Sequence, residues 1–204
     1  DGSPLFFSKE NFSNGCIATV DVAYPASPLY MLVAPKLLKA MLEPVLQYAQ
    51  SPMWPHDFAP HDVGQYPLAN GQVYGGDAAQ LQNQMPVEES GNMLIMLGVI
   101  SRIDGNAKFA SRYWDLISTW ANYLKEKGLD PENQLCTDDF AGHLAHNTNL
   151  SLKAIVALAC YSDMAGMLGD KQVAAEYRKV AESMADKKKK MAADGDHYRL
   201  AFDQ

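Results

Sequence analysis

The first segment whose residue types could do chemistry holds two His-Asp dipeptides, His56-Asp57 and His61-Asp62, five residues apart. Carboxylates serve as acids, bases or metal ligands, and histidine can do the same near neutral pH. Trp54 and Tyr66 flank the dipeptides and could wall a substrate pocket. The two aspartates could equally cap loop amides, with the histidines bonded locally, so spacing alone leaves both interpretations open.

In the second segment, Pro86–Asn92, two adjacent glutamates enter a strongly apolar stretch. The helix dipole favours acidic residues near a helix start, which accounts for one of the pair. A carboxylate in a crowded helical core costs free energy unless it is paired or protonated, and a glutamate with a raised pKa suits a general acid. We therefore predict a catalytic role for at least one of Glu88 and Glu89.

The third segment places two carboxylates, Asp138 and Asp139, before the histidines His143 and His146. Either aspartate could act in catalysis or hold a substrate. The histidines would share one face if they lay on a helix, but zinc would need a third ligand, brought through space from the first segment. There is no HExxH motif or cysteine-rich site, so we expect no metal and no other cofactor.

Other catalytic arrangements are absent from the sequence, which has no G-x-S-x-G elbow, no P-loop and no S-x-x-K. The three cysteines, Cys16, Cys136 and Cys160, lie far apart and form no CxxC, which favours buried free thiols. The net charge of −7 and the thinly spread basic residues argue against nucleic-acid binding. There is no run of about 18 apolar residues, so we expect no membrane span.

Helical spacing of apolar residues predicts the elements that must position these segments. Residues 1–25 are expected to be an irregular N-terminal segment with room for a short strand. Pro35 and Pro44 should kink or split the helical stretch that follows it. The predicted helical stretches are 27–48, 87–103, 109–127, 149–168 and 172–193, with long polar loops at 51–85 and 130–146.

Short turns and long loops alternate between these helices. Short turns join antiparallel neighbours, so the long loops should gather at one end of the array. The sequence therefore predicts an all-α fold of antiparallel helical hairpins, arranged as a toroid with a site at one rim or as a plain bundle. Its 204 residues, 48% of them apolar, favour a single domain, 1–204.

Long motifs in all three segments resemble the glutaminase A family. They read Trp-Pro-His-Asp-Phe and His-Asp-Val-Gly-Gln-Tyr-Pro from position 54, Gln-Met-Pro-Val-Glu-Glu-Ser-Gly-Asn-Met from position 84, and Thr-Asp-Asp-Phe-Ala-Gly-His-Leu-Ala-His-Asn-Thr-Asn-Leu from position 137. Asp21-Val22-Ala23-Tyr24-Pro25 fits the same family. The resemblance covers nearly the whole chain.

The resemblance implies a six-hairpin (α/α)6 toroid of the glycosidase-like type and hydrolysis of L-glutamine to L-glutamate and ammonia. It also implies a secreted, cell-envelope or periplasmic location, and a chain that holds about half of the toroid of a larger multidomain protein. The motif positions assigned to catalysis are Glu88, Glu89, Asp57, Asp138 and Asp139. Those assigned to substrate binding are Trp54, His56, His61, Asp62, Gln65, Tyr66, Asn92, His143, His146 and Asn147.

Two alternatives stay open because paired carboxylates and aromatic residues are also typical of sugar sites. One is a glycosidase, in which Glu88 or Glu89 is the acid and Asp57 or Asp138 the base. The other is a non-catalytic module that binds a glycan or another ligand. Under each hypothesis the partner is a small molecule, glutamine or a saccharide, and exposed helix faces are expected to promote self-association into homo-oligomers.

Overall fold

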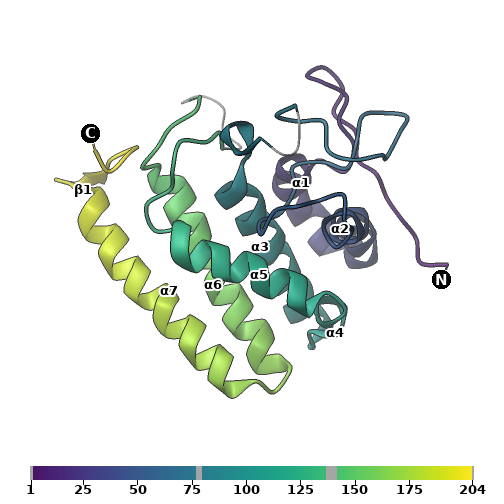
Figure 1. Cartoon of the computed structure of the whole chain (residues 1–204). Coiled ribbons are helices and arrows are strands. Elements are labelled where there is room, and N and C mark those ends of the chain that lie inside the picture. The colour runs from purple at the N-terminus through teal and green to yellow at the C-terminus, as the bar shows by residue number, and fades with distance from the viewer. Residues whose placement is uncertain (1, 77–79, 137–141, 204) are drawn as a thin grey trace.

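The computed structural model describes residues 2–76, 80–136 and 142–203. Nearly all the regular structure within these ranges is helical, which confirms the all-α prediction (Figure 1). The helices are α1 (Val20–Val33), α2 (Pro35–Ala49), η1 (Leu81–Asn83, a 3-10 turn), α3 (Pro86–Asp104), α4 (Lys108–Ser111), α5 (Trp114–Lys127), α6 (Thr148–Met167) and α7 (Lys171–Ala192). A two-residue antiparallel hairpin, β1 (Ala193–Asp194) with β2 (His197–Tyr198), follows α7.

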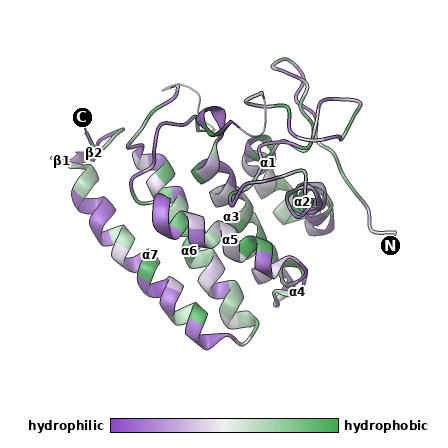
Figure 2. Ribbon diagram, in the orientation of Figure 1, coloured by the Kyte–Doolittle hydropathy of each residue, from purple (hydrophilic) through white to green (hydrophobic). Residues whose placement is uncertain are grey.

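The core forms where α6 packs between α3 and α7, while α1 covers another side of α3 and α5 contacts both α3 and α6 (Figure 1). Hydrophobic residues are frequent along α3 and α6, whereas α7 is largely hydrophilic (Figure 2). Leu97 of α3, Trp120 of α5 and Leu158 of α6 are fully buried in this core. Helix α6 is long and apolar enough to cross a membrane by length and composition alone, but most of its apolar stretch is buried inside the fold.

The first helix begins earlier than predicted. We expected an irregular segment up to residue 25, but α1 starts at Val20, and Pro25 and Pro28 lie inside it. Both prolines are on the exposed side of α1, while Val20, Ala23 and Ser27 face inward. Burial of that inner face offsets the missing proline amides, which periodicity could not reveal.

The prediction that Pro35 splits the helical stretch is correct. The chain breaks at Ala34, and Pro35 occupies the first turn of α2, where an amide donor is not needed. Pro44 lies within α2 without ending it. The stretch predicted as one helix over 109–127 is two, since α4 ends at Ser111 and α5 starts at Trp114.

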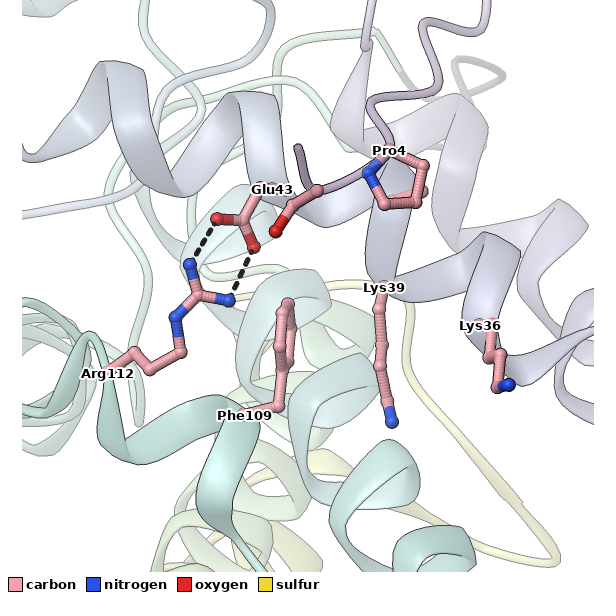
Figure 3. Close-up of a pocket in the computed structure, with 8 residues that line it drawn as sticks. Pro4, Lys36, Lys39, Glu43, Phe109 and Arg112 are labelled. Atoms are coloured by element: carbon pink, nitrogen blue, oxygen red, sulfur yellow. Dashed lines mark hydrogen bonds and ion pairs between the residues drawn. The ribbon is translucent and has the colours of Figure 1, made fainter. Parts of the chain in front are cut away.

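An ion pair between exposed Arg112, the residue that follows α4, and buried Glu43 of α2 lies at this break (Figure 3). Glu43 accepts hydrogen bonds from Arg112 at 2.8 Å and from the hydroxyl of Tyr113 at 2.5 Å. The pair forms one wall of a cavity of about 230 Å³, with Phe109 and Lys36 also in its lining. Glu43 is therefore a structural anchor for the turn between α4 and α5, which explains why the chain bends there.

The long loops lie at one end of the helix array, as predicted. In Figure 1 the described parts of 51–85 and 130–146 run along the upper side, where α3 and α6 begin, and the short turn from α6 to α7 lies at the lower side. The amino-terminal ends of α3 and α6 therefore open toward the loops that carry the polar motifs.

Candidate functional site

Two fully buried carboxylates mark the start of α3. Glu88 and Glu89 lie in its first turn, and the side-chain amide of Asn92 donates to both, at 3.0 Å to Glu88 Oε1 and 3.2 Å to Glu89 Oε2. The first-turn amides of Val87 and Glu88 are bound instead by Gln134 Oε1, at 3.0 and 3.4 Å. Because Gln134 supplies this cap, the two glutamates can point into the protein.

A buried lysine on α6 completes the cluster. Lys153 Nζ forms an ion pair with Glu88 Oε1 and lies 4.6 Å from the centre of the Tyr24 ring of α1. Its stem packs against Gly91 of α3, where a Cβ atom would come within 2.7 Å of Lys153 Cγ. Three helices, α1, α3 and α6, thus meet around one ammonium and two carboxyl groups.

The environment of Glu89 raises the pKa of its carboxyl well above the ordinary value of 4.5. Burial is the largest cause, followed by the negative charges of Asp21 and Glu88, while the Asn92 amide and Lys153 act in the opposite direction. Within the described residues, Glu89 Oε1 and Asn92 Oδ1 have no hydrogen-bond partner. A neutral carboxyl with an uncommitted oxygen can give a proton to a bound substrate, which is the property expected of a general acid.

A second cluster joins α1 to the first polar loop. His61 is 4% exposed, its Nδ1 lies 2.9 Å from Asp62 Oδ2, and its Nε2 lies 3.5 Å from Asp21 Oδ1. The ring stacks on Tyr74 with centroids 4.1 Å apart. Asp62, fully buried, accepts backbone amides from Gly64, Val73 and Tyr74 at 2.9–3.1 Å. Asp62 thus holds the loop together and fixes the imidazole.

A chain of glutamine amides links this loop to the segment before α3. Gln72 accepts the His61 amide at 2.7 Å and donates to Gln84 at 2.6 Å. Ala59 donates its amide to Ser90 Oγ of α3 at 3.0 Å. The loop carrying the His-Asp dipeptides is therefore fastened onto the end of α3 that carries Glu88 and Glu89.

Not every predicted residue of the first segment faces this region. Trp54 is buried in an aromatic cluster, with its Nε1 donating to the Phe58 carbonyl at 2.7 Å and its ring edge-on to His56. His56 is half-buried and stacks on Phe58, and Asp57 is exposed. Gln65 and Tyr66 are also exposed and contact the N-terminal segment, through Asn14 and Lys9 respectively.

The third motif is described only in part, because Asp138 and Asp139 lie outside the described residues. His143 is exposed, and His146 pairs with Asp130 at 2.8 Å in the loop before α6, with a φ of 59°. The histidines therefore do not share a helix face. Asn147 is the N-cap of α6, and its side chain accepts the amides of Asn149 and Leu150 at 2.9 and 3.1 Å.

Two members of the buried clusters, Asp21 and Lys153, are absent from the predicted site. Each carries a signal in the sequence: Asp21 interrupts an apolar run, and Lys153 lies on the buried side of a strongly apolar helix. A charged residue at a buried helical position needs a partner of opposite charge. Lys153 could have been assigned to the glutamates on that ground.

Comparison with known proteins gives the family. The chain is 36% identical to glutaminase A of Aspergillus oryzae over 180 residues, which cover 88% of this chain and 25% of that protein. It is 30% identical to a protein of Arthroderma benhamiae described as a probable glutaminase, over an alignment that covers 98% of this chain and 30% of that protein. The chain thus spans between a quarter and a third of the length of these relatives. Over residues 1–204 it matches the family described as the glutaminase A six helical-hairpin domain, and it belongs to that family.

Proposed function

We propose that this chain supplies the acid–base centre of a hydrolase that converts L-glutamine to L-glutamate and ammonia. One observation carries the proposal: a buried glutamate with a raised pKa and an uncommitted oxygen, Glu89, lies beside a glutamate held by a lysine, Glu88. The names of the two relatives, glutaminase A and probable glutaminase, supply the substrate. The same resemblance supports a secreted or cell-envelope location as part of the proposal.

The reaction needs one acid and one base. Water attacks the side-chain amide carbon, a base takes the proton from that water, and the C–N bond breaks as the nitrogen receives a proton and leaves as ammonia. Neutral Glu89 is suited to protonate the nitrogen, and the Glu88 carboxylate is suited to accept the proton from water. A proton donor and a proton acceptor placed side by side are the arrangement that environment-tuned carboxylates provide in hydrolases.

The buried positive charge beside the pair also suits an amino acid. Free glutamine carries a carboxylate, and the site holds a buried lysine, Lys153. The assigned role of Lys153 is to bind the substrate carboxylate. Lys153 comes from α6, so its position is fixed by the core.

A glycosidase is the second candidate, favoured by the pairing of two carboxyl groups with the aromatic rings of Tyr24 and Tyr74 beside the clusters. In that case Glu89 would protonate a glycosidic oxygen instead of an amide nitrogen. A non-catalytic binding module is the third outcome to be tested.

The test incubates the full-length protein that carries this segment with L-glutamine and with a panel of glycosides, and measures released ammonia and reducing sugar. Glu89→Gln is expected to lower ammonia release by about 10²–10⁴-fold, the usual effect of losing a general acid. Glu176→Gln, on exposed α7, is the matched control and should leave turnover unchanged. Release of reducing sugar without ammonia would show that the protein is a glycosidase and not a glutaminase. Release of neither product would favour the non-catalytic binding module.

A further inference from the structure

His61 presents its two ring nitrogens to two different carboxylates. Asp62 faces Nδ1 at 2.9 Å and Asp21 faces Nε2 at 3.5 Å. Glu10 lies close to both residues, since one ligand atom each of Glu10, Asp21 and His61 lie within 4.8 Å of one another. The three side chains come from separate segments: the N-terminal stretch, α1 and the loop after α2.

Asp62 sets which nitrogen of His61 carries a proton. Both of its oxygens already accept backbone amides, Oδ1 from Gly64 and Val73 and Oδ2 from Tyr74, so the carboxylate is fixed as an acceptor. Its Oδ2 therefore accepts the Nδ1–H of the imidazole, and in the neutral ring Nε2 carries a lone pair. That lone pair points at the Asp21 carboxylate, which is repulsive unless a cation lies between them.

The distance between His61 Nε2 and Asp21 Oδ1 distinguishes a shared proton from a bound metal ion. A proton shared between nitrogen and oxygen would draw the two atoms to about 2.7–3.2 Å. Two ligand atoms that each lie about 2.0–2.2 Å from a tetrahedral metal ion are about 3.4 Å apart. The 3.5 Å between His61 Nε2 and Asp21 Oδ1 matches the second arrangement.

We propose that Glu10, Asp21 and His61 Nε2 bind a divalent metal ion, with Zn²⁺ as the ion that fits one imidazole and two carboxylates. Asp62 is then the outer carboxylate that orients the ligating histidine, an arrangement that is general at metal sites. The alternative set of Cys16, His61 and Asp62 is excluded because the oxygens of Asp62 are committed to backbone amides.

The backbone holds the three ligands in register. The Glu10 amide donates to the Cys16 carbonyl at 2.9 Å, and the Val20 amide, next to Asp21, donates to the His61 carbonyl at 2.8 Å. Little rearrangement is needed to close the site. Sequence reasoning led us to expect no metal, because the chain has no HExxH motif or cysteine-rich site. Glu10 and Asp21 did not enter that reasoning, since they lie about 40–50 residues before His61.

The binding test uses the full chain after treatment with EDTA and desalting. Titration with ZnCl₂ by calorimetry, and metal content after gel filtration, should give one tightly bound Zn²⁺ per chain and a raised melting temperature. Glu10→Gln and Asp21→Asn should each raise the dissociation constant for Zn²⁺ by at least about 10-fold. His197→Gln is the control, because His197 with Asp194 and Asp196 is an exposed histidine–carboxylate group to which zinc could bind loosely.

The metal site is supported if Glu10→Gln and Asp21→Asn lose the tightly bound Zn²⁺ ion while His197→Gln keeps it. If Glu10→Gln and Asp21→Asn both keep the tightly bound Zn²⁺ ion, the proposed metal site is overturned. Absence of tight binding to the unmodified chain would also overturn it and would identify the His61–Asp21 contact as an imidazolium–carboxylate pair. Circular dichroism of each variant shows whether it is folded, and Co²⁺ absorption bands that shift in Glu10→Gln report ligation directly. The proposal does not rest on the proposed reaction, since every readout is of binding.

Discussion

At the Glu89 carboxyl, burial and two neighbouring negative charges all favour the protonated form. The folded protein therefore holds this proton more tightly than the unfolded chain does, and folding stability becomes linked to pH. Because the folded-state pKa is raised, the stabilising contribution is complete below the unfolded value of about 4.5 and is lost as pH rises toward the folded pKa.

The Glu89→Gln variant tests this linkage, because glutamine keeps the shape and cannot ionise. Stability of the native protein relative to Glu89→Gln should fall by about 1.4 kcal/mol for each pH unit above about 4.5, until the folded pKa is reached. Urea unfolding of both proteins at pH 5, 6, 7 and 8 measures the difference, in which the other titrating groups largely cancel. A difference that is constant over this range would contradict a raised pKa.

The Glu88–Lys153 pair leads to a second prediction at the residue scale. Both side chains are buried, so Lys153→Met leaves an uncompensated carboxylate and should cost about 3–5 kcal/mol. Replacing both members, as in Glu88→Gln with Lys153→Met, should cost much less, because no buried charge is then left alone. Urea unfolding of the two single variants and the double variant gives the coupling energy. Additive losses would show that the two residues do not act as a pair.

How far the site could be predicted depends on what each residue contacts. Glu88 and Glu89 are predictable, since two adjacent acids lead into an apolar helix and so must be accommodated inside. The sequence marks Lys153 and Asp21 as charged residues in apolar stretches, but their positions beside the glutamates are set by the packing of α6 and α1 on α3. Asn147 shows the converse, because its place in a specific motif suggested ligand binding while its side chain caps α6.

At the scale of elements, α3 and α6 approach closely because glycine on α3 makes room for side chains of α6. A Cβ atom at Gly98 would lie 2.6 Å from Cys160 Cβ, closer than packed atoms can come. The fit of this helix pair sets the position of Lys153 relative to Glu88, so the site depends on it.

Gly98→Ala should therefore destabilise the fold by about 1–3 kcal/mol through overpacking. Gly166→Ala is the matched control, because it lies in α6 with its nearest neighbour at an ordinary 3.7 Å. That control should gain up to about 1 kcal/mol from the better helix propensity of alanine. Thermal and urea unfolding measure both variants, and equal effects at the two positions would show that the close approach carries no energetic weight.

The helices themselves were largely predictable, with boundaries within a few residues for α3, α6 and α7, since each has long and strongly periodic apolar spacing. The misses have physical causes. The part of α1 before residue 27 was missed because Pro25 suggested an irregular segment, although the inner face of α1 is buried on α3. The Glu43 ion pair bends the chain between α4 and α5, and its partners are about 70 residues apart in sequence.

At the scale of the whole molecule, α1 has an apolar face that the other described residues leave uncovered. Leu29, Leu32 and Val33 of α1 are 61%, 83% and 65% exposed. Val33 and Leu37 also line a shallow apolar hollow of about 520 Å³ at the junction of α1 and α2. Contiguous exposed apolar surface of this kind favours association between copies.

We therefore expect the 204-residue chain to self-associate in a concentration-dependent way, despite its net charge of −7. Replacing Leu29 and Leu32 by glutamate should shift it toward the monomer, because both positions are exposed and the change adds charge without altering the core. Replacing Leu152 and Val156 of α6, which are also exposed, adds the same charge elsewhere and should leave association unchanged. Multi-angle light scattering over a range of concentrations measures the mass. A monomer at every concentration would contradict the expectation, and equal effects of the two double variants would assign association to net charge and not to the α1 face.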